Sequence, residues 1–489
     1  MSASTERKNR AAARAAGTDK KTNAVLEAEQ KARKSRRKWV AGTVAVLLCI
    51  ALVLFLSSPV MYRITTAETV GSKNYSPAEI KYIRANAKQT LMGYGYDNLL
   101  SIVGQESADQ LLKSSVDGEL VRSAVLLQYA ADEGLSLSQK QLTAIDRIMD
   151  EQMTALREAA KTSGVSLGTY MSYVFGAGVN ESVFRSSMRD NVLAAKANFH
   201  RFCSLSYSPE ELSAYYEDPA DGDVFSYSTF TVKQDEERSA EEATAAAQAL
   251  VMSFTDGYDG SVDEAEAFAD IIAEDFPDST PTQRSKVTGA NLEAALKDWL
   301  TDPARQAGDI TAIPSTDSGD WTVVLFQERG DNSETVVAVR HILIKAQADE
   351  NGVYSDEAKE AALAKAQELL DAFEQGEKTE AEFAALAYLF SEDSGSASNG
   401  GLYSAVTPGQ MVEEFDEFCF AEHSYGDTAI VYGESAAYAG YHVMFYVEAA
   451  SARDAAARDA LRSADMNAWL SSLSEGVEPV YRWAYKLVD

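Results

Sequence analysis

Two histidines lie in apolar stretches that have the pattern of β-strands. His341 stands in AVRHILIK, residues 338–345, and His442 stands in AGYHVMFYV. The chain has only four histidines in 489 residues, and these two occupy positions that favour burial. Neutral imidazoles can satisfy their nitrogens by hydrogen-bonding each other across adjacent strands. The pair therefore predicts either the floor of a functional pocket or two satisfied core histidines.

The sequence lacks the motifs of several other chemistries. GESAA at residues 433–437 does not fit the G-x-S-x-G pattern of a nucleophile elbow, and no triad spacing indicates a hydrolase. No H-E-x-x-H segment or cysteine pair indicates a metal site. Outside the apolar N-terminal stretch only Cys203 and Cys419 remain, so no disulfide framework is expected. We expect neither a metal nor a cofactor.

The two histidine strands belong to the second of two similar stretches. Four blocks recur in the same order at offsets from 113 to 120 residues: 224–232 with 338–345, 245–254 with 364–373, 264–272 with 380–388, and 307–328 with 425–448. In this alignment Ser228 takes the place of His341, and Thr322 takes the place of His442. The first stretch keeps the framework without either ring, which favours a functional role for the pair.

The remaining segments complete an α+β organisation. Residues 63–210 have apolar residues at three- and four-residue spacing and capping boxes such as that at Ser76, which predict a helical domain. Strands and helices alternate over 223–330, a degenerate α/β repeat, and over 335–450, the repeat that holds the histidines. Residues 451–489 predict a C-terminal helix and strand.

The N-terminal part of the chain predicts a membrane anchor. All 24 residues of 39–62 are uncharged, and they would form about 36 Å of helix, enough to cross a hydrocarbon core of about 30 Å. Residues 1–38 form a basic, flexible tail whose cluster KARKSRRK adjoins the apolar stretch. We expect a single-pass protein of the cell membrane with a cytoplasmic N-terminus and an extracytoplasmic main body. The alternative is a cleaved signal peptide, but no A-x-A-like site follows.

Charge is divided unevenly along the chain. Residues 1–38 hold twelve Lys or Arg against four acids, a net of +8. Because the whole chain carries −31, the rest carries −39. Phosphate groups would be repelled by such a body, so nucleic acid is excluded as its partner.

Several spaced motifs of the second repeat resemble one known family. RHILI, FAALA, SEDSGSASNGG, PGQMVEEFDEFCF and GYHVMF are similar to the parvulin-type (PpiC, rotamase) peptidyl-prolyl isomerase domain over about residues 335–450. The exported chain as a whole resembles membrane-attached foldases of the PrsA and SurA kind, which implies a helical chaperone-like domain at residues 63–210 and a degenerate parvulin-like repeat at 223–330. The resemblance implies a folding factor whose partners are unfolded or proline-containing secreted polypeptides.

The resemblance also assigns functional residues in this sequence. It implies His341, His442 and Asp393 as catalytic residues and Met411, Phe415 and Tyr403 as substrate-binding residues. The sequence departs from the family pattern at three positions. Leu402 stands where an acid often follows the double glycine, Val412 where glutamine often follows the methionine, and Ala439 where serine or threonine is common.

The chemistry of isomerisation agrees with these residue types. Rotation about an X–Pro bond has a barrier near 20 kcal/mol, and the twisted amide is less polar than the planar one. An apolar cup that holds the proline ring therefore favours the transition state. Met411 and Phe415, four residues apart, share one helix face and can supply it. The alternatives are a holdase that only cradles extended segments and an envelope assembly protein.

Overall fold

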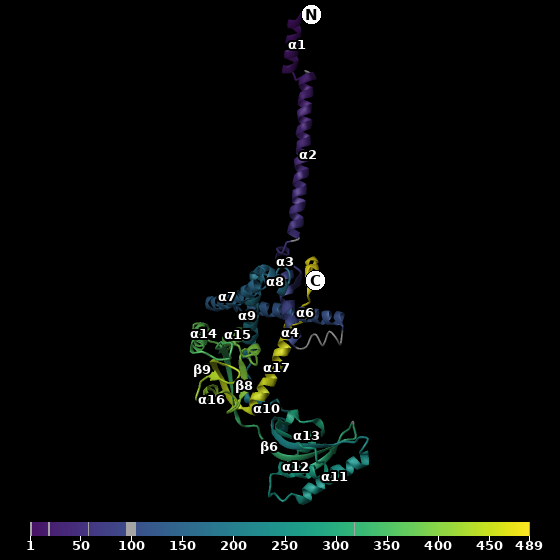
Figure 1. The fold of residues 1–489 in the computed structure, drawn as a ribbon, viewed down its shortest axis with the longest axis vertical. Coiled ribbons are helices and arrows are strands. Elements are labelled where there is room, and N and C mark those ends of the chain that lie inside the picture. Colours follow the sequence, from purple (N-terminus) through teal and green to yellow (C-terminus); the bar gives the residue numbers. More distant parts are fainter. Residues whose placement is uncertain (1, 18–19, 57, 94–103, 317, 489) are drawn as a thin grey trace. The chain divides into compact units, whose positions relative to one another are not determined.

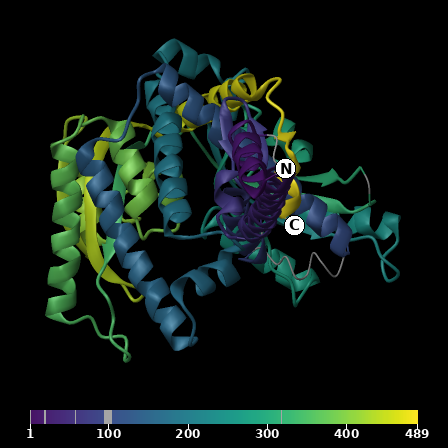
Figure 2. The ribbon, with the colours of Figure 1, turned by 90° about the horizontal axis from the view of Figure 1, so that it is seen from above.

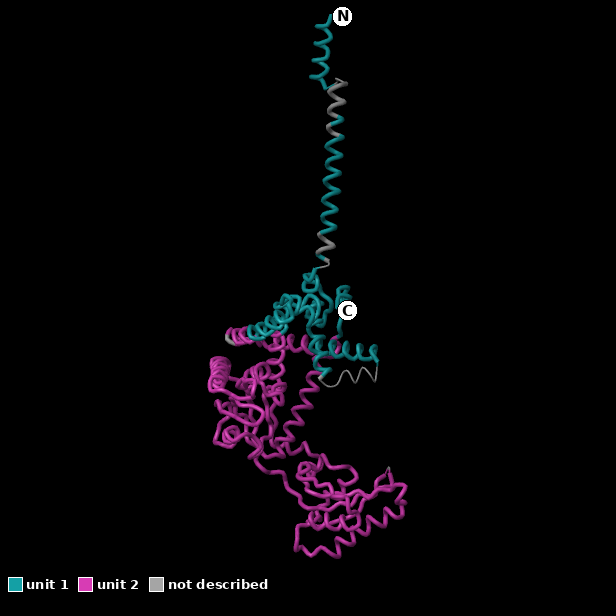
Figure 3. The backbone as a smooth tube through the Cα atoms, in the orientation of Figure 1, with its two compact units in different colours: residues 1–121, 149–187, 478–489 teal, residues 122–148, 188–477 magenta. Residues whose placement is uncertain are grey.

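In a computed structural model the chain divides into two compact units (Figures 1 and 3). Unit 1 comprises residues 1–121, 149–187 and 478–489, and unit 2 comprises residues 122–148 and 188–477. The structure describes residues 2–17, 20–56, 58–93, 104–316 and 318–488, without the side chains of residues 20–26, 29, 30, 51–54, 56, 93 and 140.

Unit 1 contains a long N-terminal helix, shorter helices and a small sheet. Its own elements are α1 Ala3–Ala15, α2 Lys20–Leu56, α3 Met61–Ile64, β1 Glu68–Val70, β2 Lys73–Tyr75, α4 Pro77–Gly93, α8 Leu167–Phe175, β11 Val480–Tyr481 and η4 Trp483–Leu487. Three further helices contribute residues to both units: α6 Gln105–Asp132, α7 Gln139–Thr162 and α9 Glu181–Ser204. The sheet order is β11-β1-β2, so the end of the chain pairs with the strand that begins at Glu68.

The N-terminal segment is helical where a flexible tail was expected. Helices α1 and α2 cover most of residues 1–38, because Ala, Arg and Lys are among the strongest helix formers. Within the described part of the chain, no helix is both long enough and apolar enough to cross a membrane. The predicted span at 39–62 includes residue 57, which lies outside that part, and residues 51–54 and 56, whose side chains are not described.

Unit 2 contains two four-stranded antiparallel sheets, ordered β4-β3-β6-β5 and β8-β7-β10-β9. The first is built from β3 Val224–Val232, β4 Thr282–Thr288, β5 Ile310–Pro314 and β6 Trp321–Gly330, with α11 Ala240–Gly257, α12 Glu264–Asp275 and α13 Ala294–Leu300. The second is built from β7 Thr335–Lys345, β8 Leu402–Val406, β9 Thr428–Glu434 and β10 Ala439–Ser451, with α14 Asp356–Glu374, α15 Glu380–Phe390 and α16 Glu413–Phe420. The remaining helices are α10 Pro209–Ala214 and α17 Ala452–Ser474, and the short 3-10 turns are η1 Pro219–Gly222, η2 Gly289–Asn291 and η3 Ala397–Asn399.

The two sheets also share an irregularity. A β-bulge in β6 lies between Phe326 and Glu328, where that strand pairs with β3. A bulge in β10 lies between Tyr446 and Glu448, where that strand pairs with β7. A bulge is a specific feature of one strand pair, so its presence at the same place indicates one structural plan for both sheets.

The strand pairing corrects one position in the sequence alignment of the two stretches. When Thr322 is matched with His442, the registers of β3–β6 and β7–β10 match Thr229 with His341. The alignment that placed Ser228 there is wrong by one residue. Successive residues of a strand point to opposite faces, so that error moves the side chain to the other side of the sheet. Local similarity between short apolar strands does not define their register.

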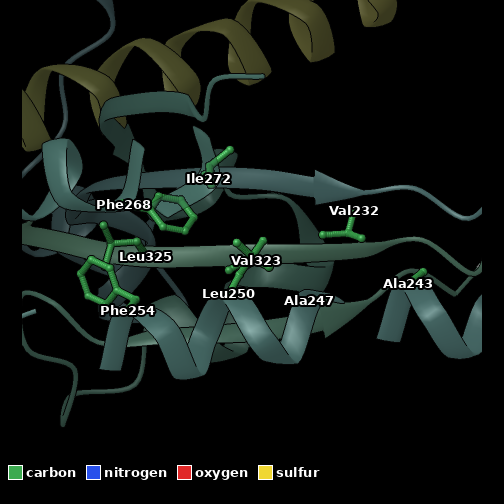
Figure 4. Packing of buried hydrophobic residues seen from close by; sticks show 9 residues of the cluster. All are labelled: Val232, Ala243, Ala247, Leu250, Phe254, Phe268, Ile272, Val323 and Leu325. Atoms are coloured by element: carbon green, nitrogen blue, oxygen red, sulfur yellow. The ribbon is translucent and has the colours of Figure 1, made fainter. Parts of the chain in front are cut away.

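Each sheet has two helices on one face and one helix on the other. In the first sheet, Phe254 of α11 and Phe268 of α12 pack against Val323 and Leu325 of β6 (Figure 4). In the second, α14 and α15 cover one face, as the light green helices beside the yellow strands show (Figure 2). Helix α16 packs on the opposite face against β7 and β9. That face carries both histidines.

Part of the predicted helical domain packs on the second sheet's helices. Phe199 of α9 lies in a buried cluster with three alanines of α15, Ala381, Ala384 and Ala385. The C-terminal segment is divided between the units, because α17 belongs to unit 2 and β11 to unit 1. The predicted helical domain and the second repeat are therefore less separate than their sequence patterns indicate.

Candidate active site

His341 and His442 meet across two neighbouring strands. Strands β7 and β10 are antiparallel, with His341 opposite Met444 and His442 opposite Leu343, so the rings lie diagonally on one face. Their Nδ1 atoms are 3.0 Å apart and their ring centroids are 5.1 Å apart. Both side chains are buried, with 2% and 4% of their surface exposed. Each ring satisfies a nitrogen of the other in a place that water does not reach.

The outer nitrogens of the two rings also have partners. Nε2 of His341 lies 2.9 Å from Oδ2 of Asp393 and 2.9 Å from the Ser396 hydroxyl, which itself donates to Asp393 at 2.5 Å. Nε2 of His442 lies 2.9 Å from the hydroxyl of Tyr438. All four ring nitrogens are therefore within hydrogen-bond distance of a polar group.

One arrangement of protons satisfies this network with both rings neutral. An ionised Asp393 only accepts, so His341 donates through Nε2–H and accepts at Nδ1. His442 then donates its Nδ1–H to His341, and its Nε2 accepts from Tyr438. The hydrogen bonds run in one direction from Tyr438 to Asp393.

Burial supports a neutral His442 ring, and hydrogen bonding supports an ionised Asp393 carboxylate. Burial, together with the neighbouring His341, lowers the pKa of His442 to about 3. The hydrogen bond from His341 holds the pKa of Asp393 well below its ordinary value, and the bond from Ser396 acts in the same direction. Burial and the charge of Asp393 raise the pKa of Tyr403 to about 12, so its hydroxyl stays protonated and donates to Asp393 at 3.0 Å.

An apolar wall adjoins the ring pair. The ring of Phe415 on α16 is 5.3 Å from each histidine ring and meets both edge-on. Phe415 lies in a buried cluster with Met444 of β10, and Met411 packs against this cluster while keeping part of its surface exposed. The site thus places the hydrogen-bonded histidine network beside an apolar surface on the same side of the sheet.

The loop 391–401, between α15 and β8, carries the acidic part of the site. It is tied to β7 by backbone bonds, from the amide of Glu392 to the carbonyl of Leu343 at 2.8 Å and from the amide of His341 to the carbonyl of Gly401 at 2.9 Å. Gly401 has φ 73°, and a Cβ atom there would lie 2.1 Å from the backbone oxygen of His341. Only glycine allows the loop to approach the histidine strand this closely.

The second sheet and its helices match a known domain family. Residues 324–446 match the family described as the PPIC-type PPIASE domain. This region is a parvulin-type domain. Within the described part of the chain, no group of three or more His, Cys, Asp or Glu side chains is arranged as metal ligands would be.

The chain is also similar to bacterial proteins described as SurA chaperones. It is 26% identical over 301 residues to Chaperone SurA of Alkalilimnicola ehrlichii, covering 59% of this chain and 65% of that protein. It is 37% identical over 130 residues to Chaperone SurA of Pseudomonas syringae pv. syringae, covering 26% of this chain and 27% of that protein. The crystal structure of PrsA from Bacillus subtilis aligns with 78% of this chain and 84% of its own at 15% identity, with a TM-score of 0.20. The chain spans less than two thirds of the length of these SurA relatives.

The structure brings the predicted site residues of the parvulin-type domain together. Both histidines, Asp393 and Tyr403 share one hydrogen-bond network, and Phe415 packs on the rings. Met411 lies at the edge of the same apolar cluster. Their assignment as catalytic or substrate-binding residues stays a prediction.

Two members of the network have no signal in the sequence. Ser396 is one of four serines in SEDSGSASNGG, and Tyr438 is one of several tyrosines near β10. Position alone offers a hint, because Ser396 follows Asp393 by three residues and Tyr438 precedes His442 by four. Only the fold shows which hydroxyls reach the rings.

The three departures from the family pattern all carry apolar side chains. Ala439 is fully buried, Val412 packs on the cluster of Phe415, and Leu402 bonds Asn399 only through its backbone. None of these side chains can extend the hydrogen-bond network. The polar part of the site therefore rests on the histidines, Asp393 and the hydroxyls around them.

Proposed function

We propose that the chain is a peptidyl-prolyl cis–trans isomerase and folding factor for secreted or cell-surface polypeptides. The observation that carries this proposal is the buried pair of His341 and His442, joined at 3.0 Å and packed edge-on against Phe415. The match of residues 324–446 to the PPIC-type family supports it. So does the similarity to SurA chaperones, which makes unfolded polypeptides the expected clients.

The proposed mechanism uses shape and polarity rather than covalent chemistry. Unassisted rotation about an X–Pro bond takes tens of seconds because the planar amide is stabilised by resonance. Phe415 and Met411 would hold the proline ring while the preceding carbonyl turns. The twisted amide has a less polar carbonyl, so an apolar, water-poor surface favours it over the planar ground state. No bond breaks, and no cofactor is needed.

The histidine network has a defined part in this mechanism. Its nitrogens are all paired, so it presents no unsatisfied donor or acceptor that would bind the planar carbonyl and stabilise the ground state. Asp393 fixes the tautomer of His341, and that tautomer fixes His442. The pair would thereby keep the surface beside Phe415 rigid.

A short X–Pro peptide and the full chain test the proposal. We expect the chain to accelerate isomerisation, measured by exchange NMR between the cis and trans signals, and His442→Ala to remove the acceleration. His423→Ala is the matched control, since His423 lies in the same domain but contacts Phe418 and Asp427 instead of the ring pair. An inactive wild-type chain, or a His442→Ala chain as active as wild type, would rule the proposal out.

A holdase is the second candidate function. The sheet without histidines and the chaperone relatives both favour a chain that binds extended segments without isomerising them. Light scattering of an aggregating client protein separates the two activities. Suppressed aggregation with no acceleration of the peptide identifies a holdase, whereas one stable partner in a pull-down and neither activity identifies an envelope assembly protein.

The proposed location is the outer face of the cell membrane, with a single N-terminal anchor. Support comes from the uncharged stretch 39–62 and the basic residues that precede it. In intact cells without a wall, added protease should digest the main body and spare an N-terminal tag. A chain with residues 39–62 deleted should leave the membrane fraction. Membrane retention of the deleted chain would contradict the anchor.

A further inference from the structure

Arg340 is the largest fully buried side chain of the chain's described part, and it adjoins His341 in sequence. It points to the opposite face of β7, where none of its surface is exposed. Its Nε donates to Glu380 at 2.8 Å, and its Nη1 donates to the carbonyls of Asn399 and Gly400 at 3.0 and 2.9 Å. A buried guanidinium therefore grips the turn that ends loop 391–401.

That turn is directly connected to the ring pair. Gly401 follows the gripped carbonyls, donates its amide to the carbonyl of Ser396 at 2.8 Å and accepts from the amide of His341 at 2.9 Å. Ser396 in turn donates to Asp393, and both contact Nε2 of His341. A change in the turn is transmitted to the acidic side of the network through two short backbone bonds.

The end of α9 completes the surroundings of Arg340. Its guanidinium lies 5.7 Å from the ring of Phe199 and 5.5 Å from the ring of Phe202, with Nη2 3.7 Å from the sulfur of Cys203. A Cβ atom on Gly400 would lie 2.9 Å from both Phe199 and Arg340. Helix α9 precedes the matched domain in the chain, yet it forms one wall around the residue that grips the loop.

The first sheet indicates that this arrangement serves the site rather than the fold. In the corrected register, Ser228 corresponds to Arg340 just as Thr229 corresponds to His341. Ser228 is equally buried and bonds Gln327 at 3.4 Å. The sheet without the histidines thus also lacks the arginine, and it folds on the same plan.

We propose that Arg340, held by Glu380 and by the end of α9, is a positioning residue that sets the hydrogen bonds of Asp393 and Ser396 to His341. Removal of one partner from a buried ion pair leaves the other uncompensated, so the charge of Arg340 is maintained by Glu380. The expected effect of Arg340 on catalysis rests on the proposed isomerase function. Its expected effect on the hydrogen bonds of the histidine rings is independent of that function.

NMR of the full chain with ¹⁵N-labelled histidine tests the proposal directly. The four histidines give a simple spectrum, in which His341 Nε2–H and His442 Nδ1–H should be protected from exchange with solvent. Arg340→Lys keeps the charge but cannot bond Glu380 and two carbonyls in one plane. We expect the His341 signal to shift and lose protection, while the His423 signal stays in place.

Phe199→Leu is the second variant, chosen because it keeps apolar bulk and leaves the hydrogen bonds of Arg340 intact. We expect a smaller shift of the same His341 signal. Arg453→Lys is the matched control. Arg453 bonds Asp223 at 2.7 Å and the carbonyl of Pro219 at 2.8 Å, rather than loop 391–401 or the ring pair. It should leave the histidine signals unchanged.

The outcomes separate this proposal from the proposed function. With an active wild type, Arg340→Lys should lower kcat/KM about tenfold, as the loss of one or two charged hydrogen bonds implies. If the wild type proves inactive, the function fails and the spectra still decide the positioning role. If Arg340→Lys does not fold, Phe199→Leu decides. Folded variants with an unmoved His341 signal would overturn the proposal.

Discussion

In the first sheet of unit 2, Thr229 and Thr322 occupy the positions that His341 and His442 hold in the second. The strand order, the bulge and the placement of helices on the two faces are otherwise the same. The connection before the first edge strand differs, since residues 276–281 join α12 to β4 and the longer loop 391–401 joins α15 to β8.

This comparison separates what the fold needs from what the site adds. The first sheet buries its core with Phe254, Phe268 and Leu325 and needs no ring pair or buried arginine. The second sheet adds two imidazoles, Arg340 and a loop that carries Asp393. Each addition removes polar groups from water, which costs free energy unless every group is paired. In the second sheet the two imidazoles bond each other, Asp393 and neighbouring hydroxyls. Arg340 bonds Glu380 and two backbone carbonyls.

The largest expected effect follows from making the second sheet like the first. His341→Thr combined with His442→Thr should abolish isomerisation of an X–Pro peptide. The free energy of unfolding should fall by less in the double variant than the sum of its falls in the two single variants. Each single variant strands a buried nitrogen at a cost of about 1–3 kcal/mol, whereas the double variant removes both partners.

Urea unfolding of the four proteins measures this coupling. Single-variant costs that simply add would show that the rings do not depend on each other. An active double variant would show that the difference between the two sheets has nothing to do with isomerisation.

A pH titration should next distinguish the two sheets. The pKa of His442 is lowered to about 3 in the folded chain, whereas a histidine in the unfolded chain titrates near 6.5. Between these values the unfolded state binds the extra proton, so stability is complete above about pH 6.5 and falls as the pH drops towards 3. The loss at pH 5 is about 2 kcal/mol.

Pulse proteolysis in urea, with the fragments identified by mass spectrometry, follows the two sheets separately. The second sheet should weaken between pH 7 and pH 5 while the first does not, and His442→Thr should abolish the difference. Equal acid sensitivity of both sheets would mean that His442 does not govern it.

The comparison also shows where sequence reasoning succeeds. His341 and His442 were expected on adjacent strands because both stand in apolar stretches that have the pattern of strands, and the resemblance to parvulin-type domains implies them as a pair. The same resemblance implies Phe415 beside the rings, and its spacing of four residues from Met411 places both on one helix face. These inferences use apolar stretches and spaced motifs, which are present in a linear sequence.

Other features leave no periodic trace. Ser228 was aligned with His341 because short apolar strands resemble each other at several offsets, and register depends on pairing partners and bulges. Ser396 reaches the rings from the loop between α15 and β8, and Tyr438 reaches them from the residue just before β10. The wall that α9 provides for Arg340 depends on contacts across more than a hundred residues, to which local propensity is blind.

A moderate effect is expected at the loop that the first sheet lacks. Asp393→Asn removes the acceptor that fixes the tautomer of His341 and should lower isomerase activity about tenfold. The pKa of Asp393 is lowered in the folded chain, so its stabilisation is present above the unfolded value near 3.9 and is lost as the pH falls below it. Asp393→Asn should lack that acid-dependent loss.

Peptide kinetics and acid unfolding curves check both parts. Asp427→Asn is the matched control, because Asp427 also faces a histidine, His423, at 3.5 Å but is half exposed. If Asp427→Asn reduces activity as much as Asp393→Asn, the effect comes from charge on the domain rather than from the network.

The smallest effect is expected from the reverse exchange. Thr229→His and Thr322→His place two rings at the matched positions of the first sheet. In a chain that already carries His442→Ala, this graft should restore no isomerisation. The connection 276–281 is shorter than loop 391–401, and α13 packs leucines onto the sheet where α16 packs Phe415. Rings without those partners should destabilise the first sheet by about 1–3 kcal/mol. Restored activity in the peptide assay would mean that two histidines suffice and that the loop, the arginine and α9 serve stability alone.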